Sequence, residues 1–111
     1  MQAEMQEIAL PPEAQIKIEL SVTAQVQVTH VTAQRIVSRF LLDQVGNLLY
    51  GEHPSLVVGE RLLWRVPVWL GSPTRGPLGQ IGVVDVDAQS GEILFTHKLI
   101  DELETRGNAL A

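Results

Sequence analysis

The sequence predicts a single α+β domain, in which an antiparallel sheet of four or five strands packs on one long helix and a short helix closes the chain. Three patterns predict this class: strict apolar–polar alternation over residues 16–28, helical spacing of apolar residues over 33–49, and strand-like runs over 55–95 separated by turn residues. We expect a flexible lead-in over residues 1–13 and one domain over residues 14–111. A chain of 111 residues has room for one core of ordinary size.

Composition and charge narrow the class of protein. The chain is 45% hydrophobic and 19% charged, which is typical of globular domains. Its formal net charge is −5 and its 8 Lys and Arg residues are spread along the chain, which opposes nucleic acid as a partner. The absence of Cys excludes disulfides, thiolate metal ligands and a thiol nucleophile.

The first residues and the apolar runs bear on localisation. The N-terminal stretch has acids where a secretory signal has basic residues, and no apolar segment follows it. No apolar run approaches the ~20 residues that span a membrane. We therefore expect a cytoplasmic protein without a membrane partner.

Residues 16–28 alternate strictly between apolar and polar side chains. The apolar set is Ile16, Ile18, Leu20, Val22, Ala24, Val26 and Val28. A period of two predicts a strand with one buried face and one face in water. A straight strand of this length would extend roughly 45 Å, whereas a domain of this size is about 26 Å wide. Two interpretations remain open: the strand bends at a bulge, or one end reaches a partner.

The next predicted element is a long amphipathic helix. Thr32 is the expected N-cap, and Val31 and Ile36 are spaced to form a hydrophobic staple. The stripe that should face the core is Ala33, Ile36, Val37, Phe40, Leu41, Val45, Leu48 and Leu49. Because Gly46 weakens the last turns, we expect the regular helix to end between residues 45 and 50.

The second half predicts an antiparallel meander. Its expected strands cover residues 55–58, 61–70, 81–87 and 92–95. An exposed nine-residue loop over 71–79 should join the two long strands, and a tight turn over 87–91 should precede the last one. Pro67 cannot donate to a ladder, so it should lie at an edge-facing position or a bulge.

Alternation in the long strand assigns its side chains to two faces. One face is predicted to hold Leu62, Trp64, Val66, Val68 and Leu70. The other holds Leu63, Arg65, Pro67 and Trp69, so Trp69 is expected to be partly exposed.

A second helix should close the chain. Thr96 is its expected N-cap, and Leu99, Ile100 and Leu103 are its apolar residues. Glu102 and Arg106 lie at an i, i+4 spacing. We expect the helix to fray at residues 107–108, which are Gly and Asn.

The meander carries a resemblance to a known family. After the amphipathic helix come Leu62-x-Trp64-x-Val66-x-Val68, a Gly-rich loop, and Val84-Asp85-Val86-Asp87-Ala88-x-Ser90-Gly91-Glu92-Ile93-Leu94. On these motifs residues 32–95 resemble the PepSY-type module, in which one helix packs on an antiparallel meander in a cystatin/PepSY-like arrangement. The resemblance implies a peptidase-inhibitor role. The alternating segment and the closing helix depart from the family pattern.

A second resemblance rests on part of the same stretch. Trp64-Arg65-Val66-Pro67-Val68 and Gly91-Glu92-Ile93-Leu94, with a closing helix, look like small uncharacterised bacterial proteins found beside PIN-type toxin genes. This resemblance implies an antitoxin-like companion of a small toxin.

No spacing in the sequence predicts a catalytic, cofactor or metal site. The imidazoles are not at metal-ligand spacing; they are His30, His53 and His97. The polar residues of the last hairpin resemble the start of a calcium loop; they are Asp85, Asp87, Ser90 and Glu92. Ser90 at the glycine position and Thr96 at the bidentate Glu position break that pattern. We therefore expect turn-forming acids, no cofactor and no enzyme activity.

The expected function is a non-enzymatic protein-interaction module that self-associates as a homodimer, through the alternating segment or the outer face of the sheet. The candidate interaction residues are Trp69, Ser72, Thr74 and Arg75, with Lys17 and Glu19 on the polar side of the alternating segment. The alternatives are an antitoxin-like companion and a peptidase-inhibitor-like or small-ligand-binding domain. A ligand-binding protein would need a deep polar cavity between helix and sheet, and a filled aliphatic interface would count against it.

Overall fold

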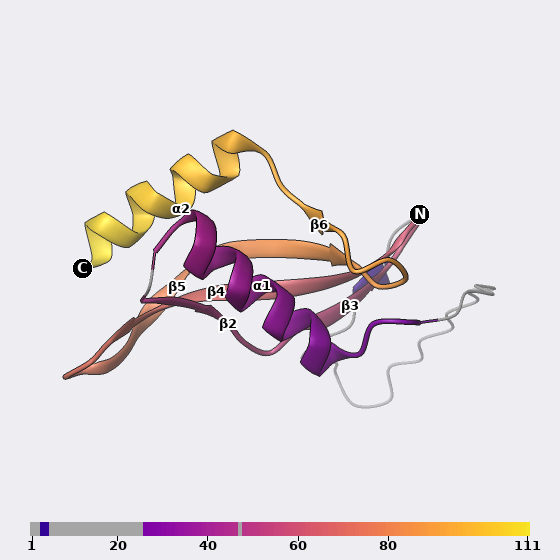
Figure 1. The fold of residues 1–111 in the computed structure, drawn as a ribbon, viewed down its shortest axis with the longest axis horizontal. Helices are drawn as coiled ribbons and strands as arrows, with labels where there is room; N and C mark the ends of the chain where they lie inside the picture. The colour runs from indigo at the N-terminus through magenta and orange to yellow at the C-terminus, as the bar shows by residue number, and fades with distance from the viewer. Residues whose placement is uncertain (1–2, 5–25, 47) are drawn as a thin grey trace, which may run out of the picture.

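The computed structural model describes residues 3–4, 26–46 and 48–111, which form two helices and one antiparallel sheet (Figure 1). The elements are β1 Ala3–Glu4, α1 His30–Gln44, β2 Leu49–Gly51, β3 Ser55–Val58, β4 Leu62–Ser72, β5 Gly76–Asp87, β6 Ile93–Leu94 and α2 His97–Leu110. The strand order is β1-β3-β4-β5-β6, and β2 pairs with β4 on the side of β3. The predicted α+β class, with a long helix before the meander and a second helix after it, is confirmed.

The predicted first strand is described only at its carboxyl end. Residues 16–25, which include Lys17 and Glu19, lie outside the described residues. Residues 26–28 are not a strand, contrary to the prediction. The backbone N–H groups of Gln27 and Val28 both donate to the carbonyl oxygen of Ala88, at 3.1 and 2.9 Å. Two donors on one carbonyl do not form a ladder, so this segment contacts the β5–β6 turn without joining the sheet.

Part of the predicted flexible lead-in is described. Ala3 and Glu4 form β1 and pair antiparallel with Val58 and Val57 of β3. The domain boundary predicted at residues 13–14 lies outside the described residues.

Helix α1 begins before the predicted position. Its N-cap is Thr29, whose hydroxyl accepts from the backbone N–H of Thr32 at 3.2 Å, so the prediction of Thr32 as N-cap is wrong. Both threonines have the chemistry of an N-cap, and packing selects the earlier one. The indole Nε1–H of Trp64 donates to the carbonyl of Val28 at 2.7 Å, and its ring contacts His30 at 6.2 Å between centroids.

The predicted helical stripe extends too far. The helix ends at Gln44, and Leu49 belongs instead to β2, a short strand that the sequence analysis did not predict. Leu49 pairs with Leu70 of β4. Gly51 allows β2 to pass close to the helix, because a Cβ there would lie 3.2 Å from Val37 Cγ1 of α1 and 2.7 Å from Val66 Cγ1 of β4. The close approach of α1 to the sheet therefore depends on this glycine.

The central element is the long β4–β5 hairpin. Pairing continues as far as Ser72 and Gly76, so the predicted nine-residue loop is wrong and only residues 73–75 form the turn. The register shifts between Val68 and Trp69, and again between Leu70 and Gly71. These irregularities place extra residues in β5, which allows a Gly- and Pro-rich stretch to remain in the ladder.

Pro67 lies in the middle of β4, opposite Val83. Its carbonyl accepts from the N–H of Glu52 at 3.1 Å, so its ring nitrogen faces the same side, where the chain passes from β2 to β3. Because Pro67 lies opposite this irregular passage, the missing N–H of proline leaves no ladder hydrogen bond of β4 unmade.

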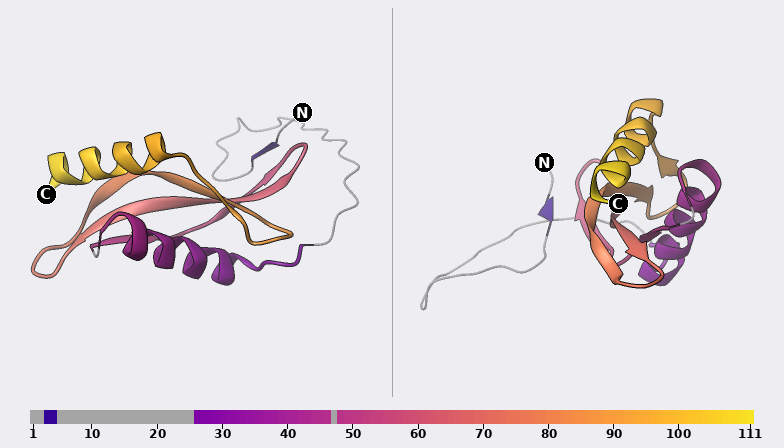
Figure 2. Two further views of the ribbon diagram at one scale, coloured as in Figure 1. Left: turned by 45° about the horizontal axis from the view of Figure 1, so that its top comes forward. Right: turned by 90° about the vertical axis from the view of Figure 1, so that its left-hand side faces the viewer.

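Both helices pack on one face of the sheet, which we call the inner face (Figure 2). The core between them is mainly aliphatic and consists of Val28, Ala33, Val37, Phe40, Leu41, Leu49, Val66, Val68, Leu70, Ile81, Val84, Val86, Ile100 and Leu103. The predicted face of the long strand is confirmed by the burial of Leu62, Val66, Val68 and Leu70. Phe40 contacts the more exposed Phe95 at 4.8 Å between centroids.

Helix α2 starts as predicted and ends later than predicted. The hydroxyl of Thr96 accepts from the N–H of Leu99 at 3.1 Å. The helix continues through Gly107 and Asn108 to Leu110, so the predicted fraying is wrong. A Cβ on Gly82 of β5 would lie 2.8 Å from Leu103 Cδ2, which shows how closely the helix approaches the strand.

Candidate functional site

The predicted contact residues at the hairpin tip form a compact exposed turn. The hydroxyl of Ser72 accepts from the backbone N–H groups of Thr74 and Arg75 at 3.4 and 3.3 Å. Gly76 follows with φ of 71°, a conformation that suits glycine. The Arg75 side chain is exposed and has no ion-pair partner among the described residues. The tip therefore presents one cation on an ordered turn.

Trp69 lies on the opposite side of the sheet from the helices. We call this side the outer face; it includes Tyr50, Leu63, Arg65, Pro67, Trp69, Val83 and Asp85. The indole is half-buried, as predicted, and it pairs across the strands with Tyr50 and Gln80. Its Nε1–H is buried and has no hydrogen-bond partner in the described part of the chain. A buried N–H without an acceptor is costly.

The outer face is apolar at its centre and charged beside it. Val83 is 37% exposed, and neither helix of the described chain covers this face (Figure 2). Arg65 and Asp85 form a two-pronged ion pair, with Nε–Oδ1 at 3.0 Å and Nη2–Oδ2 at 3.2 Å. The part of the outer face formed by β3 is not accessible to solvent, since Ser55 and Val57 are buried. The accessible apolar area therefore lies on the β4–β5 hairpin.

Of the predicted turn-forming acids, Asp87 holds the turn before β6, whereas Asp85 lies in β5 and pairs with Arg65. The Asp87 carboxylate accepts from the backbone N–H groups of Ser90 and Gln89 at 2.9 and 2.8 Å, and from Arg61 at 2.7 Å. The Ser90 N–H, then the Arg61 side chain and the Gln89 N–H, lower the pKa of Asp87 from 3.8 to about 2. Its oxygens are thus occupied by structural hydrogen bonds.

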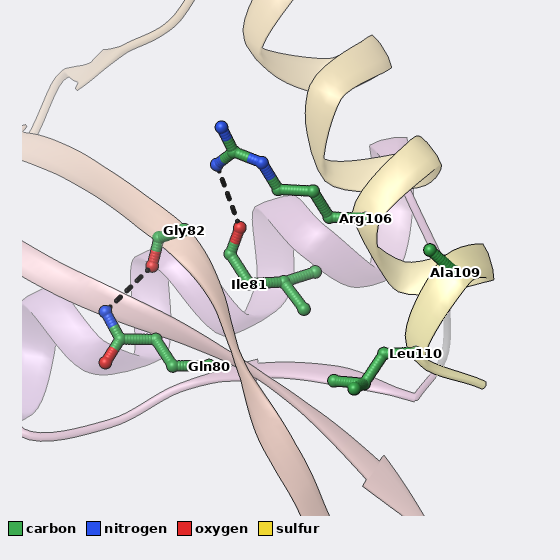
Figure 3. A pocket seen from close by; sticks show the side chains of 6 residues that line it. All are labelled: Gln80, Ile81, Gly82, Arg106, Ala109 and Leu110. Carbon is green, nitrogen blue, oxygen red and sulfur yellow. Dashed lines mark hydrogen bonds between the residues drawn. The ribbon is translucent and has the colours of Figure 1, made fainter.

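A further surface feature is an open groove between β5 and α2, with a volume of about 630 Å³ (Figure 3). Its lining is Gln80, Ile81, Gly82, Arg106, Ala109 and Leu110. Arg106 Nη1 donates to the carbonyl of Ile81 at 3.1 Å, and Gln80 Nε2 lies 3.5 Å from the carbonyl of Gly82. The groove could not be predicted from the spacing of Arg106, which relates this residue only to Glu102 on the same helix. Gly82, inside the predicted strand over residues 81–87, was the available signal of a close approach.

A smaller hollow of about 310 Å³ lies on the other side of α2. Its lining combines the end of α1, β2, β4 and the last turns of α2: Val45, Gly46, Leu48, Leu49, Leu70, Leu103, Glu104, Gly107, Asn108 and Ala111. The interface between α1 and the sheet is by contrast filled with aliphatic side chains. The two hollows therefore belong to the margins of α2.

Within the described ranges, no group of three or more His, Asp or Glu side chains is placed to hold a metal ion. In the same ranges, neither helix has the length and apolar character needed to cross a membrane. Comparison with known proteins finds no matching family model, no matching curated protein and no matching solved structure.

Proposed function

We propose that this chain is a non-enzymatic protein-interaction module that self-associates through the outer face of its sheet. The observation that carries the proposal is Trp69, a half-buried indole with an unpartnered N–H on a face without a helix. Tyr50, Pro67 and Val83 surround it with partly exposed apolar surface. Aromatic residues of this kind often anchor protein interfaces.

The charges of the outer face suit a second copy of the chain. Arg65 and Asp85 lie side by side on neighbouring strands. Across a two-fold axis, the same patch meets itself, so each arginine can approach the other copy's aspartate. A face that contains both partners of an ion pair is thus self-complementary.

The filled aliphatic interface under α1 supports a binding module over a small-ligand protein. The PepSY-like inhibitor role and the antitoxin-like companion role remain predictions. Both roles also require a protein-binding surface, so they differ from the proposed module in which protein is bound.

The test is the oligomeric state of a charge variant on the outer face. We expect sedimentation equilibrium to show a concentration-dependent dimer for the wild type. Val83→Glu should weaken association by at least about tenfold, since it buries an unpaired carboxylate in an apolar contact. Leu42→Glu is the matched control, because Leu42 is an exposed apolar residue of α1. It should leave the dimer unchanged.

Two outcomes would contradict the proposal. One is a wild-type monomer at every concentration. The other is a dimer that survives Val83→Glu but is lost when residues 1–22 are removed. The second result would assign self-association to the alternating segment and leave the outer face without a role.

A further inference from the structure

Strand β5 has a long edge that no described strand covers. β4 pairs with β5 along almost its whole length, whereas β6 pairs only with Asp85 and Val86. Residues 76–84 of β5 therefore have no strand on their second side within the described chain, a stretch of roughly 25–30 Å. Exposed edges of this length are usually blocked or used for binding.

The register shows which backbone groups this edge presents. Pro67 directs its carbonyl away from β5, so its pairing with Val83 involves no ladder hydrogen bond. The N–H and C=O of Val83 consequently point to the uncovered edge. The same alternation directs the N–H of Asp87 outward, where it donates to the carbonyl of Glu92 at 2.8 Å. Val83 thus offers one donor and one acceptor beside the end of β6.

The groove beside this edge adds an anchor for an anionic side chain. Arg106 donates one N–H to the carbonyl of Ile81, and this hydrogen bond holds the guanidinium over the strand (Figure 3). Its other N–H groups have no partner among the described residues. Ala109 and the 41% exposed Leu110 supply the apolar wall.

We infer that the β5 edge binds an extended peptide segment of another protein, with an acidic side chain of the segment on Arg106 and an apolar side chain against Leu110. The segment would hydrogen-bond to Val83 and add a strand beside β6, a common mode of peptide recognition. A second copy paired edge to edge would bring another Arg106 to the same place, and like charges would oppose it. The edge shares Val83 with the outer face, but Arg106 lies on α2 on the other side of the sheet, so Arg106→Gln tests the peptide site without touching the outer-face contact.

The probe for this test is a displayed library of short random segments, panned on the full chain. We expect enrichment of alternating segments with an acidic residue. A synthetic peptide of the enriched sequence should shift the backbone NMR signals of residues 79–84 and Arg106. Arg106→Gln should weaken its binding at least tenfold, because a charge-assisted hydrogen bond is lost. Arg35→Gln, at an exposed position of α1, should bind normally.

A second pair of variants tests the backbone contact. Val83→Pro removes the edge N–H and leaves the β4–β5 ladder intact, because that N–H points away from β4. It should abolish binding, whereas Val83→Thr should retain it. The inference is overturned by enrichment without acidic preference, by equal affinity in Arg106→Gln, or by signal shifts on the outer face or hairpin tip instead of the edge.

Discussion

The two helices begin alike and are held very differently. Each starts at a threonine whose hydroxyl accepts a backbone N–H three residues later, Thr29 for α1 and Thr96 for α2. Helix α1 buries Ala33, Val37, Phe40 and Leu41, and it contacts β2, β4 and β5. Helix α2 buries Ile100 and Leu103, and the strand it contacts most is β5. Both helices thus begin at the same kind of cap, whereas the shared core sets how firmly each is attached.

The molecule therefore has a tightly packed part around α1 and a less tightly packed margin around α2. The last turns of α2 have a groove on one side and a hollow on the other. Elements with few buried contacts open first in native proteins. We therefore expect α2 to detach from the sheet before α1 does.

The largest effect should come from the α1 core. Leu41 is fully buried, so Leu41→Ala should lower the free energy of unfolding by about 2–5 kcal/mol. Leu42→Ala changes the next residue, which is 54% exposed, and should cost less than about 0.5 kcal/mol. Urea denaturation of both variants measures the difference. Equal losses would mean that α1 is not the firmer attachment.

The second effect should separate α2 from the rest. In Gly82→Ala the new methyl group would meet Leu103 Cδ2 at 2.8 Å, which should push the helix outward at a cost of about 1–3 kcal/mol. Hydrogen exchange should accelerate in α2 and remain slow in α1. Gly46→Ala is the control, since no atom lies within 4 Å of its added Cβ. Uniform acceleration in both helices would argue against separate docking.

The third effect concerns the turn that joins the two parts. Because folding lowers the pKa of Asp87 to about 2, its stabilising contribution is complete above about pH 4 and is lost as the pH falls toward 2. Asp87→Asn should therefore cost on the order of 1–2 kcal/mol at neutral pH. The wild-type and variant unfolding curves should converge in acid. A stability difference between wild type and Asp87→Asn that does not change with pH would rule out the carboxylate as its source.

The smallest effect should distinguish the two caps. Thr29→Ala should lower global stability by about 1 kcal/mol, because α1 unfolds with the core. Thr96→Ala should instead raise the exchange rates of the first amides of α2 and leave the denaturation midpoint nearly unchanged. A matching global loss in both variants would show that the two helices unfold as one unit.

Much of the fold was predictable because the signals were local. Alternation in β4 identified its buried face, and the chemistry of Asp87 identified the turn before β6. The errors arose where distant residues decide between equal local choices. Thr29 and Thr32 are both suitable caps, and the partner of Trp64 selects the first. The Gly- and Pro-rich stretch after Leu70 has the composition of a loop, yet bulged pairing keeps most of it in the ladder.

The candidate surfaces were predictable only in part. Trp69 and the hairpin tip followed from their positions on a strand and a turn. The groove beside α2 did not, because it depends on how the closing helix lies against the glycines of β5. Sequence spacing within one helix cannot show that Arg106 reaches the carbonyl of Ile81, which is 25 residues away.

The connection from β2 to β3 shifts the register of pairing with β4 by one residue. Between the pairs Gly51–Val68 and Ser55–Arg65, the edge has three residues where β4 has two. His53, with φ of 57°, lies within this extra length. Removing one residue there would leave two residues opposite two, so the side chains of β3 would stay on their present faces in a regular strand, whereas removing two would turn them over. Deletions at this point should therefore be tolerated by parity, for one residue and not for two.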